Sequence, residues 1–331
     1  MSKYLLSSLL MIILISACVS ASRNSTAKSD PTTTPSNVME PAANNIDSSV
    51  IAQPPLSILE LPRSQDGEII LSEGYYEGDF RSYCLQPGTP DPSGRDAYTQ
   101  APLNAYRKDI VETVLRNSVD RTDLDQRNIQ LLLWSVVSGS DYNRLSSSVK
   151  STSRQLLSSK QIFALQGGVM GVVKTIAASL PETGSKSVLG DMKDLFELGN
   201  SSYEVYERLA VSRQPSTIHR PDYKKDQWYK QDGGYYVRYF PSSYQRTKIQ
   251  VYVPKGTLDQ DGKRSGNYLT FDPVTMMAIP ANSNSQRLGI GAPVAVIIRK
   301  VIQINKSTPS PKKPPVTPPN PNPNPKGIVL N

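Results

Sequence analysis

Both ends of this chain carry long stretches that a packed core cannot use. Residues 19–66 are rich in Ser, Thr, Asn, Ala and Pro, and residues 307–331 contain nine prolines and an alternating Asn–Pro run. Such compositions favour extended, solvated backbone and bury too little apolar surface to fold. The sequence therefore predicts a disordered stalk over residues 19–66 and a disordered tail over residues 307–331, which leaves residues 67–306 for the folded body.

The charge of the chain is concentrated in its tail. The net charge is +8, and residues 299–331 contribute six basic side chains and no acidic one. The body is therefore close to neutral, and we expect no nucleic-acid partner. A single His and two Cys cannot supply a His-rich zinc site, a four-Cys cluster or a disulfide framework. We expect no metal, no cofactor and no small-molecule substrate.

The N-terminus has the pattern of an export signal. Lys3 is followed by an apolar run over residues 9–15 and then by the segment Ile15-Ser16-Ala17-Cys18. This segment resembles the signal of bacterial lipoproteins, in which residues 1–18 would be a signal peptide and Cys18 the first mature residue, carrying palmitate or related acyl chains. The resemblance implies membrane attachment through Cys18. An ordinary signal peptide with a chance Cys is the alternative.

The residue after Cys18 bears on which membrane the anchor would enter. Val19 stands where inner-membrane lipoproteins of many Gram-negative bacteria carry Asp. The resemblance therefore implies the outer membrane of a bacterial cell envelope, and it leaves open whether the body faces the periplasm or the surface.

The folded body divides into two halves by its hydrophobic pattern. Over residues 101–211 apolar side chains recur at helical spacing, whereas from residue 235 onward they alternate with polar ones as in strands. The run over residues 73–79, rich in Gly, Tyr and acidic residues, is interpreted as a solvated loop. The sequence therefore predicts an α+β protein with a mainly helical domain over residues 67–213 and a small β-rich domain over residues 214–306.

Two residues of the body are unusual for an exported protein. If Cys18 is lipidated, Cys84 is the one thiol left in an oxidising compartment. Gln130 lies among apolar neighbours in the predicted helix, four residues before Trp134. A Gln on a buried helix face is costly unless its amide is hydrogen-bonded.

Together these residues resemble the thioester domains of bacterial surface adhesins. In that family a Cys after an aromatic residue is joined to the Gln of a Gln-x-x-x-Trp helix segment. The resemblance implies that Cys84 supplies the thiol and Gln130 the acyl group, while Tyr83 and Trp134 shield the bond. The sequence departs from the family pattern at Ile129, at Leu132 and in its short Cys-to-Gln segment. The alternative is that Cys84 is a small core residue and Gln130 hydrogen-bonds a loop carbonyl.

Basic and aromatic residues interleave over residues 219–252. Such a surface could stack on sugars or hold an anionic polymer, and its alternative is an aromatic-rich β edge with solvated Lys side chains. The candidate binding face consists of Arg220, Trp228, Tyr229, Tyr235 and Arg238.

These features favour a binding protein over an enzyme. We expect a lipid-anchored envelope protein that acts in surface attachment, with a protein or glycan partner and an internal thioester between Cys84 and Gln130. The alternative function is a structural or accessory subunit of a secretion, motility or appendage assembly in the envelope, in which the flexible ends serve as tethers. No acid–base pair can be assigned, so a glycan-processing enzyme is disfavoured.

Overall fold

The computed structural model describes residues 52–105, 107–166, 185–199, 201–216, 223, 225–295 and 301–304. The predicted signal peptide with Cys18, the stalk up to residue 51 and the tail from residue 307 lie outside the described residues. So does Arg220 of the predicted binding face.

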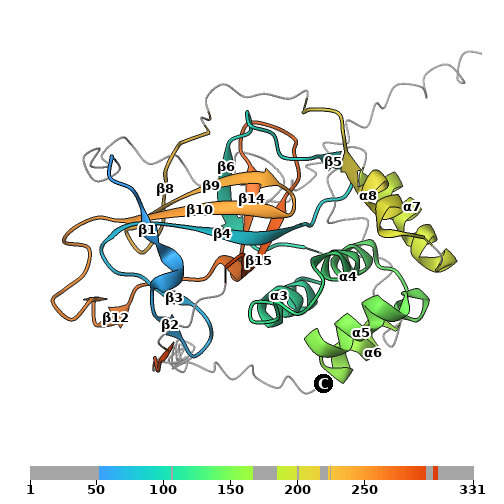
Figure 1. Ribbon diagram of the computed structural model, residues 1–331, viewed down its shortest axis with the longest axis horizontal. Helices are drawn as coiled ribbons and strands as arrows, with labels where there is room; N and C mark the ends of the chain where they lie inside the picture. Colours follow the sequence, from blue (N-terminus) through green and yellow to red (C-terminus); the bar gives the residue numbers. More distant parts are fainter. Residues whose placement is uncertain are drawn as a thin grey trace, which may run out of the picture.

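The centre of the fold is a closed antiparallel barrel of six strands (Figure 1). In spatial order its strands are β4 (Gly74–Cys84), β10 (Arg246–Val253), β9 (Tyr236–Ser243), β6 (Tyr98–Pro102), β14 (Met276–Pro280) and β15 (Leu288–Pro293). Pairing of β15 with β4 closes the barrel. Two short strands extend it, because β1 (Leu56–Ser57) pairs with β4 and β8 (Tyr229–Lys230) pairs with β9.

The inward faces of the barrel strands follow the two-residue period of β structure. On β10 the side chains of Thr247, Ile249, Val251 and Val253 are fully buried, and the residues between them are charged, polar or aromatic. Successive side chains of a strand point to opposite faces, so the apolar set fills the barrel and the other set covers its outside.

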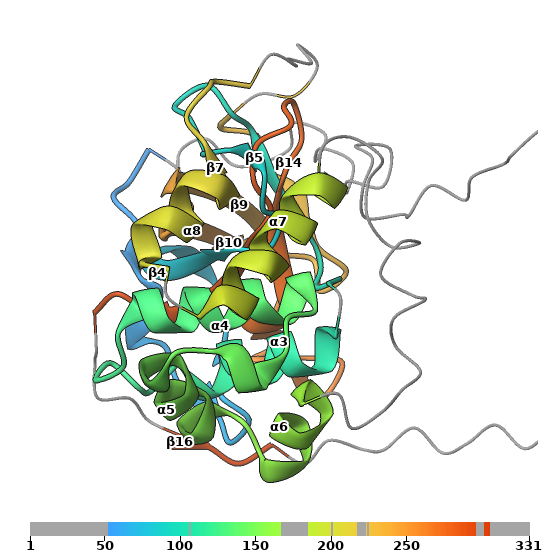
Figure 2. The same cartoon turned by 90° about the vertical axis from the view of Figure 1, so that its right-hand side faces the viewer.

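Six α-helices in the described part of the chain lie between β6 and β9 in sequence. They are α3 (Lys108–Asn117), α4 (Gln126–Ser138), α5 (Ser147–Leu156), α6 (Ser159–Leu165), α7 (Ser185–Leu198) and α8 (Tyr203–Ala210). Figure 2 shows α3 and α4 between the barrel and the pair α5 and α6. In the described ranges, no helix combines the length and the apolar character needed to cross a bilayer.

Helix α4 is the central helix and has clear local determinants. Asp125 caps its first turn by accepting a hydrogen bond from the backbone N–H of Arg127. Gly139 ends it in the left-handed conformation, with φ 69°, which a residue without Cβ adopts most easily. All of its residues from Ile129 to Ser138 are buried, because the barrel and neighbouring helices surround it.

Smaller elements complete the fold. A four-stranded sheet contains β13 (Thr270–Phe271), β3 (Ile69–Ile70), β2 (Arg63–Ser64) and β16 (Val301–Ile302). Two further pairs are β5 (Thr89–Pro90) with β7 (Val211–Ser212), and β11 (Lys263–Arg264) with β12 (Asn267–Tyr268). The 3-10 helices are η2 (Ile58–Glu60), η3 (Tyr142–Arg144) and η5 (Pro273–Thr275).

The predicted fold class, a mainly helical domain followed by a small β-rich domain, is wrong. Strands β4 and β6 precede the helices in sequence, yet they pair with β9, β10, β14 and β15, which follow them. The run over residues 73–79, interpreted as a loop, belongs largely to β4. Its outward side chains are polar and its pairing partners are distant in sequence, so local periodicity gave little sign of a strand.

The predicted stalk also extends too far into the chain. Residues 56–66 contain β1, η2 and β2, and Ile58 is fully buried against the barrel. Gly78 of β4 makes room for it, since a Cβ on Gly78 would lie 2.6 Å from Cγ2 of Ile58. The folded body therefore begins about ten residues earlier than its composition indicated.

The buried role of Ile58 predicts a contrast with Leu56, which lies two residues earlier and is 61% exposed. Ile58→Val should lower the free energy of unfolding by about 0.5–1.5 kcal/mol, although it removes one carbon only. Leu56→Ala removes three carbons and should change it by about 0.5 kcal/mol or less. Urea denaturation followed by circular dichroism measures both. An Ile58→Val effect no larger than that of Leu56→Ala would mean that this segment does not dock on the barrel.

Candidate functional site

Cys84 and Gln130 are in direct contact, although they are 46 residues apart in sequence. Cys84 is the last residue of β4, and Gln130 lies in the second turn of α4. The backbone N–H of Cys84 donates to Oε1 of Gln130 at 2.9 Å, and Nε2 of Gln130 donates to the backbone carbonyl of Cys84 at 3.0 Å. The carboxamide is therefore held beside Cys84 by both of its polar atoms.

The carboxamide of Gln130 lies beside Cys84 because β10 ends before it reaches that residue. Pairing between β10 and β4 ends at Arg81, whereas β15 continues along β4 and pairs Leu288 with Cys84. The N–H and C=O of Cys84 have no strand partner on the side that β10 has left, and a buried backbone group without a partner is costly. The carboxamide of Gln130 supplies one donor and one acceptor there, in the manner of a short strand.

The site is closed to solvent. Cys84, Gln130 and Trp134 are all buried. Burial raises the pKa of the Cys84 thiol to about 12, and the nearby polar groups of the Trp134 side chain and the Gln86 backbone offset this only in part. The thiol is therefore protonated at neutral pH, as expected of a sulfur enclosed by apolar groups.

Of the two predicted shielding aromatics, the structure brings Trp134 to the thiol. Trp134 lies one helical turn after Gln130 on the same face of α4. Tyr83 precedes Cys84 on β4, so its side chain points to the other face of the strand. Its ring is packed close to Gly291 of β15, where an added Cβ would lie 2.7 Å from Cε2 of Tyr83. The arrangement gives Tyr83 a packing role on the opposite side of the strand.

Two tyrosines outside the predicted thioester site complete the aromatic cover. Tyr203 of α8 stacks on Trp134 with ring centres 5.8 Å apart, and Tyr244 lies 6.3 Å from it in the turn between β9 and β10. The hydroxyls of Tyr203 and Tyr244 are 2.7 Å apart, and that of Tyr244 donates to Glu207 at 2.6 Å. No local pattern signals this cluster, because α8 and the turn meet only in the folded protein.

Acidic groups flank the aromatic cover on its polar side. The backbone N–H of Tyr244 donates to Asp91 at 2.9 Å, and Glu207 pairs with Arg213 at 3.5 Å. Burial raises the pKa of Asp91 above its ordinary value. Burial and the hydrogen bond to Glu207 raise the pKa of Tyr244, so its hydroxyl stays neutral and donates. The carboxylate of Asp91 also contributes, after burial, to the raised pKa of the Cys84 thiol.

The predicted binding face is divided between the two sides of the barrel wall. Tyr229 and Tyr235 belong to the main core and are buried, whereas Trp228 packs in a separate small cluster with Tyr75 and Tyr252. The guanidinium of Arg238 lies 4.2 Å from the ring centre of Trp228. Trp228 and Arg238 therefore share the outer surface, and Tyr229 and Tyr235 do not.

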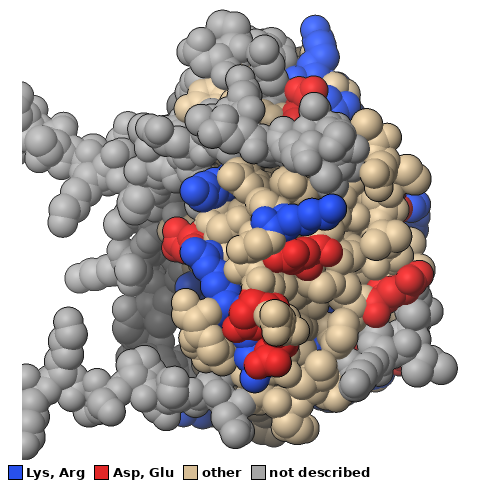
Figure 3. Space-filling view, turned by 90° about the vertical axis from the view of Figure 1, so that its left-hand side faces the viewer, with Lys and Arg blue, Asp and Glu red and all other residues tan. Residues whose placement is uncertain are grey.

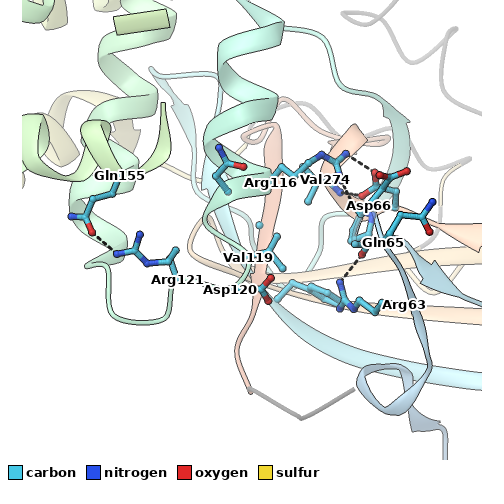
Figure 4. Close-up of a pocket in the computed structure, with 15 residues that line it drawn as sticks. Arg63, Gln65, Asp66, Arg116, Val119, Asp120, Arg121, Gln155 and Val274 are labelled. Atoms are coloured by element: carbon cyan, nitrogen blue, oxygen red, sulfur yellow. Dashed lines mark hydrogen bonds and ion pairs between the residues drawn. The ribbon is translucent and has the colours of Figure 1, made fainter. Parts of the chain in front are cut away.

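A polar cavity of about 520 Å³ lies where α3, η5 and the segment around β2 meet. Figure 4 shows Arg116 directed toward Asp66, and Gln155 bonded to Arg121 across the turn after α3. Arg116 also pairs with Asp272 at 2.6 Å. The described residues that line the cavity include no Ser, Thr, Cys, His or Lys. Its acidic side chains are Asp66, Asp120 and Asp272, and the ion pair between Arg116 and Asp272 joins α3 to η5.

Basic and acidic side chains are interspersed on the face of the molecule seen in Figure 3, without a large area of one sign.

Comparisons of the chain with protein-family models, with curated proteins and with solved structures gave no match.

Proposed function

We propose that Cys84 and Gln130 form an internal thioester, and that the protein uses it for covalent attachment at the bacterial envelope. The observation that carries the proposal is the hydrogen bond from the Cys84 backbone N–H to Oε1 of Gln130. When a nucleophile adds to the carboxamide carbon, negative charge develops on this oxygen. A fixed backbone donor aimed at the developing oxyanion is the usual means of stabilising such an intermediate.

Formation of the bond needs only groups that are present at the site. The Cys84 sulfur attacks the carboxamide carbon of Gln130, the new C–S bond forms, and the C–N bond breaks. The thiol proton leaves with the nitrogen, so the products are the thioester and ammonia. The hydrogen bond that Nε2 donates would be lost with the ammonia, whereas the bond accepted by Oε1 can remain.

Capture of a target opens the thioester and releases the Cys84 sulfur. An amine of the partner attacks the acyl carbon, an amide bond forms, and the C–S bond breaks. The Cys84 thiolate then takes up the proton that the amine releases. Water could attack the same carbon and leave a Glu side chain, so burial beneath Trp134 and its two tyrosines supports a long-lived reactive bond. Each molecule would react once, as an attachment protein does.

The location of this activity rests on the N-terminal sequence. A lipidated Cys18 would anchor the chain in the outer membrane, and the polar segment up to about residue 55 would separate the folded body from the bilayer. A reactive bond on such a tether would convert weak contact with a protein or amine-bearing glycan into a permanent link.

Intact mass of the full chain tests the thioester. Relative to the mass expected from its sequence and lipidation, the protein should be lighter by about 17 Da, the mass of ammonia. Methylamine treatment should then add one molecule of methylamine at Gln130, and peptide mass spectrometry should locate it there. Cys84→Ala should show neither change, because it lacks the nucleophile.

Cys84→Ala is a well-matched control, since both hydrogen bonds to Gln130 use only the backbone of residue 84. A wild-type chain with unshifted mass and a thiol that reacts only after unfolding would refute the thioester. It would leave Cys84 as a core residue whose backbone is capped by Gln130.

A further inference from the structure

The outer face of β9, β10 and β4 carries side chains in regular rows. Cross-strand pairing aligns Glu77 with Gln250 and Arg238, and the next row aligns Asp79 with Lys248 and Phe240. Gln250 donates to Glu77 at 2.9 Å. Neighbouring strands are about 4.8 Å apart, so these polar groups form an ordered ladder across the sheet. We call this surface the outer barrel face.

Arg238 is the most unusual residue of the outer barrel face. Its guanidinium donates to Gln250 at 2.6 Å, to the backbone carbonyl of Asp226 at 3.0 Å and to the Tyr75 hydroxyl at 3.3 Å. It also lies over the rings of Trp228 and Phe240, at 4.2 and 5.3 Å from their centres. All of these partners are neutral, and no carboxylate in the described residues forms an ion pair with it.

The charge of Arg238 is therefore fixed in position, and no ion pair with it is present among the described residues. The other two basic groups nearby are paired, since Arg246 contacts Asp79 at 3.0 Å and Lys248 contacts Glu77 at 3.5 Å. A planar guanidinium held by neutral partners is prepared to bind a carboxylate, because its remaining N–H groups keep a fixed geometry.

Arg238 lines a broad groove of about 820 Å³ on this face. The lining consists of Asp79, Asp226, Arg238, Phe240, Ser242, Arg246, Lys248 and Gln250. Three of these side chains are basic and two are acidic, and the others offer a hydroxyl, an amide and an aromatic ring. The acidic and hydroxyl groups offer acceptors beside the donors of the basic side chains and Gln250, and the half-buried Phe240 adds an apolar surface among them.

We infer that this groove binds an acidic saccharide, with Arg238 contacting its carboxylate. A sugar chain presents hydroxyls that donate and accept along its length, which fits the mixed donors and acceptors of the lining, and the apolar face of a pyranose packs on an aromatic ring. The unpaired guanidinium selects a carboxylate-bearing unit over a neutral one. An acidic peptide fits less well, because the groove lacks apolar pockets for alternate side chains.

The saccharide site goes beyond the thioester proposal and does not depend on it. Asp79 lies five residues before Cys84 on β4, and its side chain is on the outer surface, whereas Cys84 is in the buried site beneath Trp134. Non-covalent binding to a glycan would bring the body to a surface before any covalent step.

Isothermal titration calorimetry on the full chain in detergent tests the site. The probes are two carboxylate-bearing oligosaccharides, hexagalacturonate and a hyaluronan hexamer, with neutral maltohexaose and a hexaglutamate peptide for comparison. We expect saturable binding of at least one acidic oligosaccharide and none of maltohexaose. Arg238→Gln should weaken this binding by at least about tenfold, and added salt should weaken it further.

Two other variants control for folding and for charge. Ser242→Trp places a bulky ring into the groove from an exposed position and should abolish binding without affecting the core. Arg144→Gln removes the same charge from an exposed residue on the helical side and should bind like the wild type. Failure of both acidic oligosaccharides to bind, wild-type affinity in Arg238→Gln, or equal affinity for hexaglutamate would each overturn the inference.

Discussion

Replacing Trp134 by Ala is expected to lower the free energy of unfolding by about 3–5 kcal/mol. Trp134 is fully buried at the centre of α4 and packs on both Tyr203 and Tyr244. Its removal would leave a cavity between the helices and the barrel and would take away two ring contacts. Urea denaturation monitored by circular dichroism measures the loss as a lower midpoint at an unchanged slope.

The control for this experiment is Phe163→Ala, because Phe163 of α6 is 60% exposed. Its truncation should change the free energy of unfolding by about 0.5 kcal/mol or less. If the thioester forms, Trp134→Ala should also shorten its lifetime in water, seen as conversion of Gln130 to Glu. A Trp134→Ala protein as stable as Phe163→Ala would show that α4 does not join the barrel to the helices.

Gln130→Leu is expected to lower the free energy of unfolding by about 2–6 kcal/mol. The substitution keeps the side chain's size but removes both hydrogen bonds to Cys84, leaving a buried N–H and a buried C=O without partners. Each such group costs about 1–3 kcal/mol. The same denaturation experiment measures this effect. In a chain that carries the thioester, only the hydrogen bond to Oε1 is present to be lost, so the hydrogen-bonding part of the effect falls to about 1–3 kcal/mol.

Gln155→Leu is the matched control, because Gln155 is an exposed residue of α5 and should tolerate the change within about 0.5 kcal/mol. Cys84→Ala should cost less than Gln130→Leu, since its backbone hydrogen bonds persist. If Gln130→Leu were as stable as Gln155→Leu, the carboxamide would not be capping the end of β4.

The candidate site could be predicted only in part from the sequence. A resemblance to a known family pairs Cys84 with Gln130, and the structure brings these two residues into contact. The same resemblance implies a shielding role for Tyr83 that its place on β4 does not fit, because adjacent residues of a strand point to opposite faces. Tyr203 and Tyr244, which cover Trp134, come from segments whose meeting depends on the tertiary fold.

The sequence also could not show which residues of the predicted binding face lie on the same surface. Tyr235 and Arg238 are three residues apart, and composition alone placed both on one surface. The structure instead places Tyr235 in the main core and Arg238 on the outside of the barrel. Only the start of β9 and its register against β10 decide which residues of this segment face inward.

By itself, the sequence determined where helices and the clearest strands form, and which residues carry unusual chemistry. Helical spacing marked the stretch that contains α3 and α4, and alternation marked β10, because these signals act between residues close in the chain. The tertiary structure alone decided that β4 and β6 join the later strands in one barrel around an inserted set of helices. Strand pairing is made between distant segments, and its energy depends on partners that a local pattern does not contain.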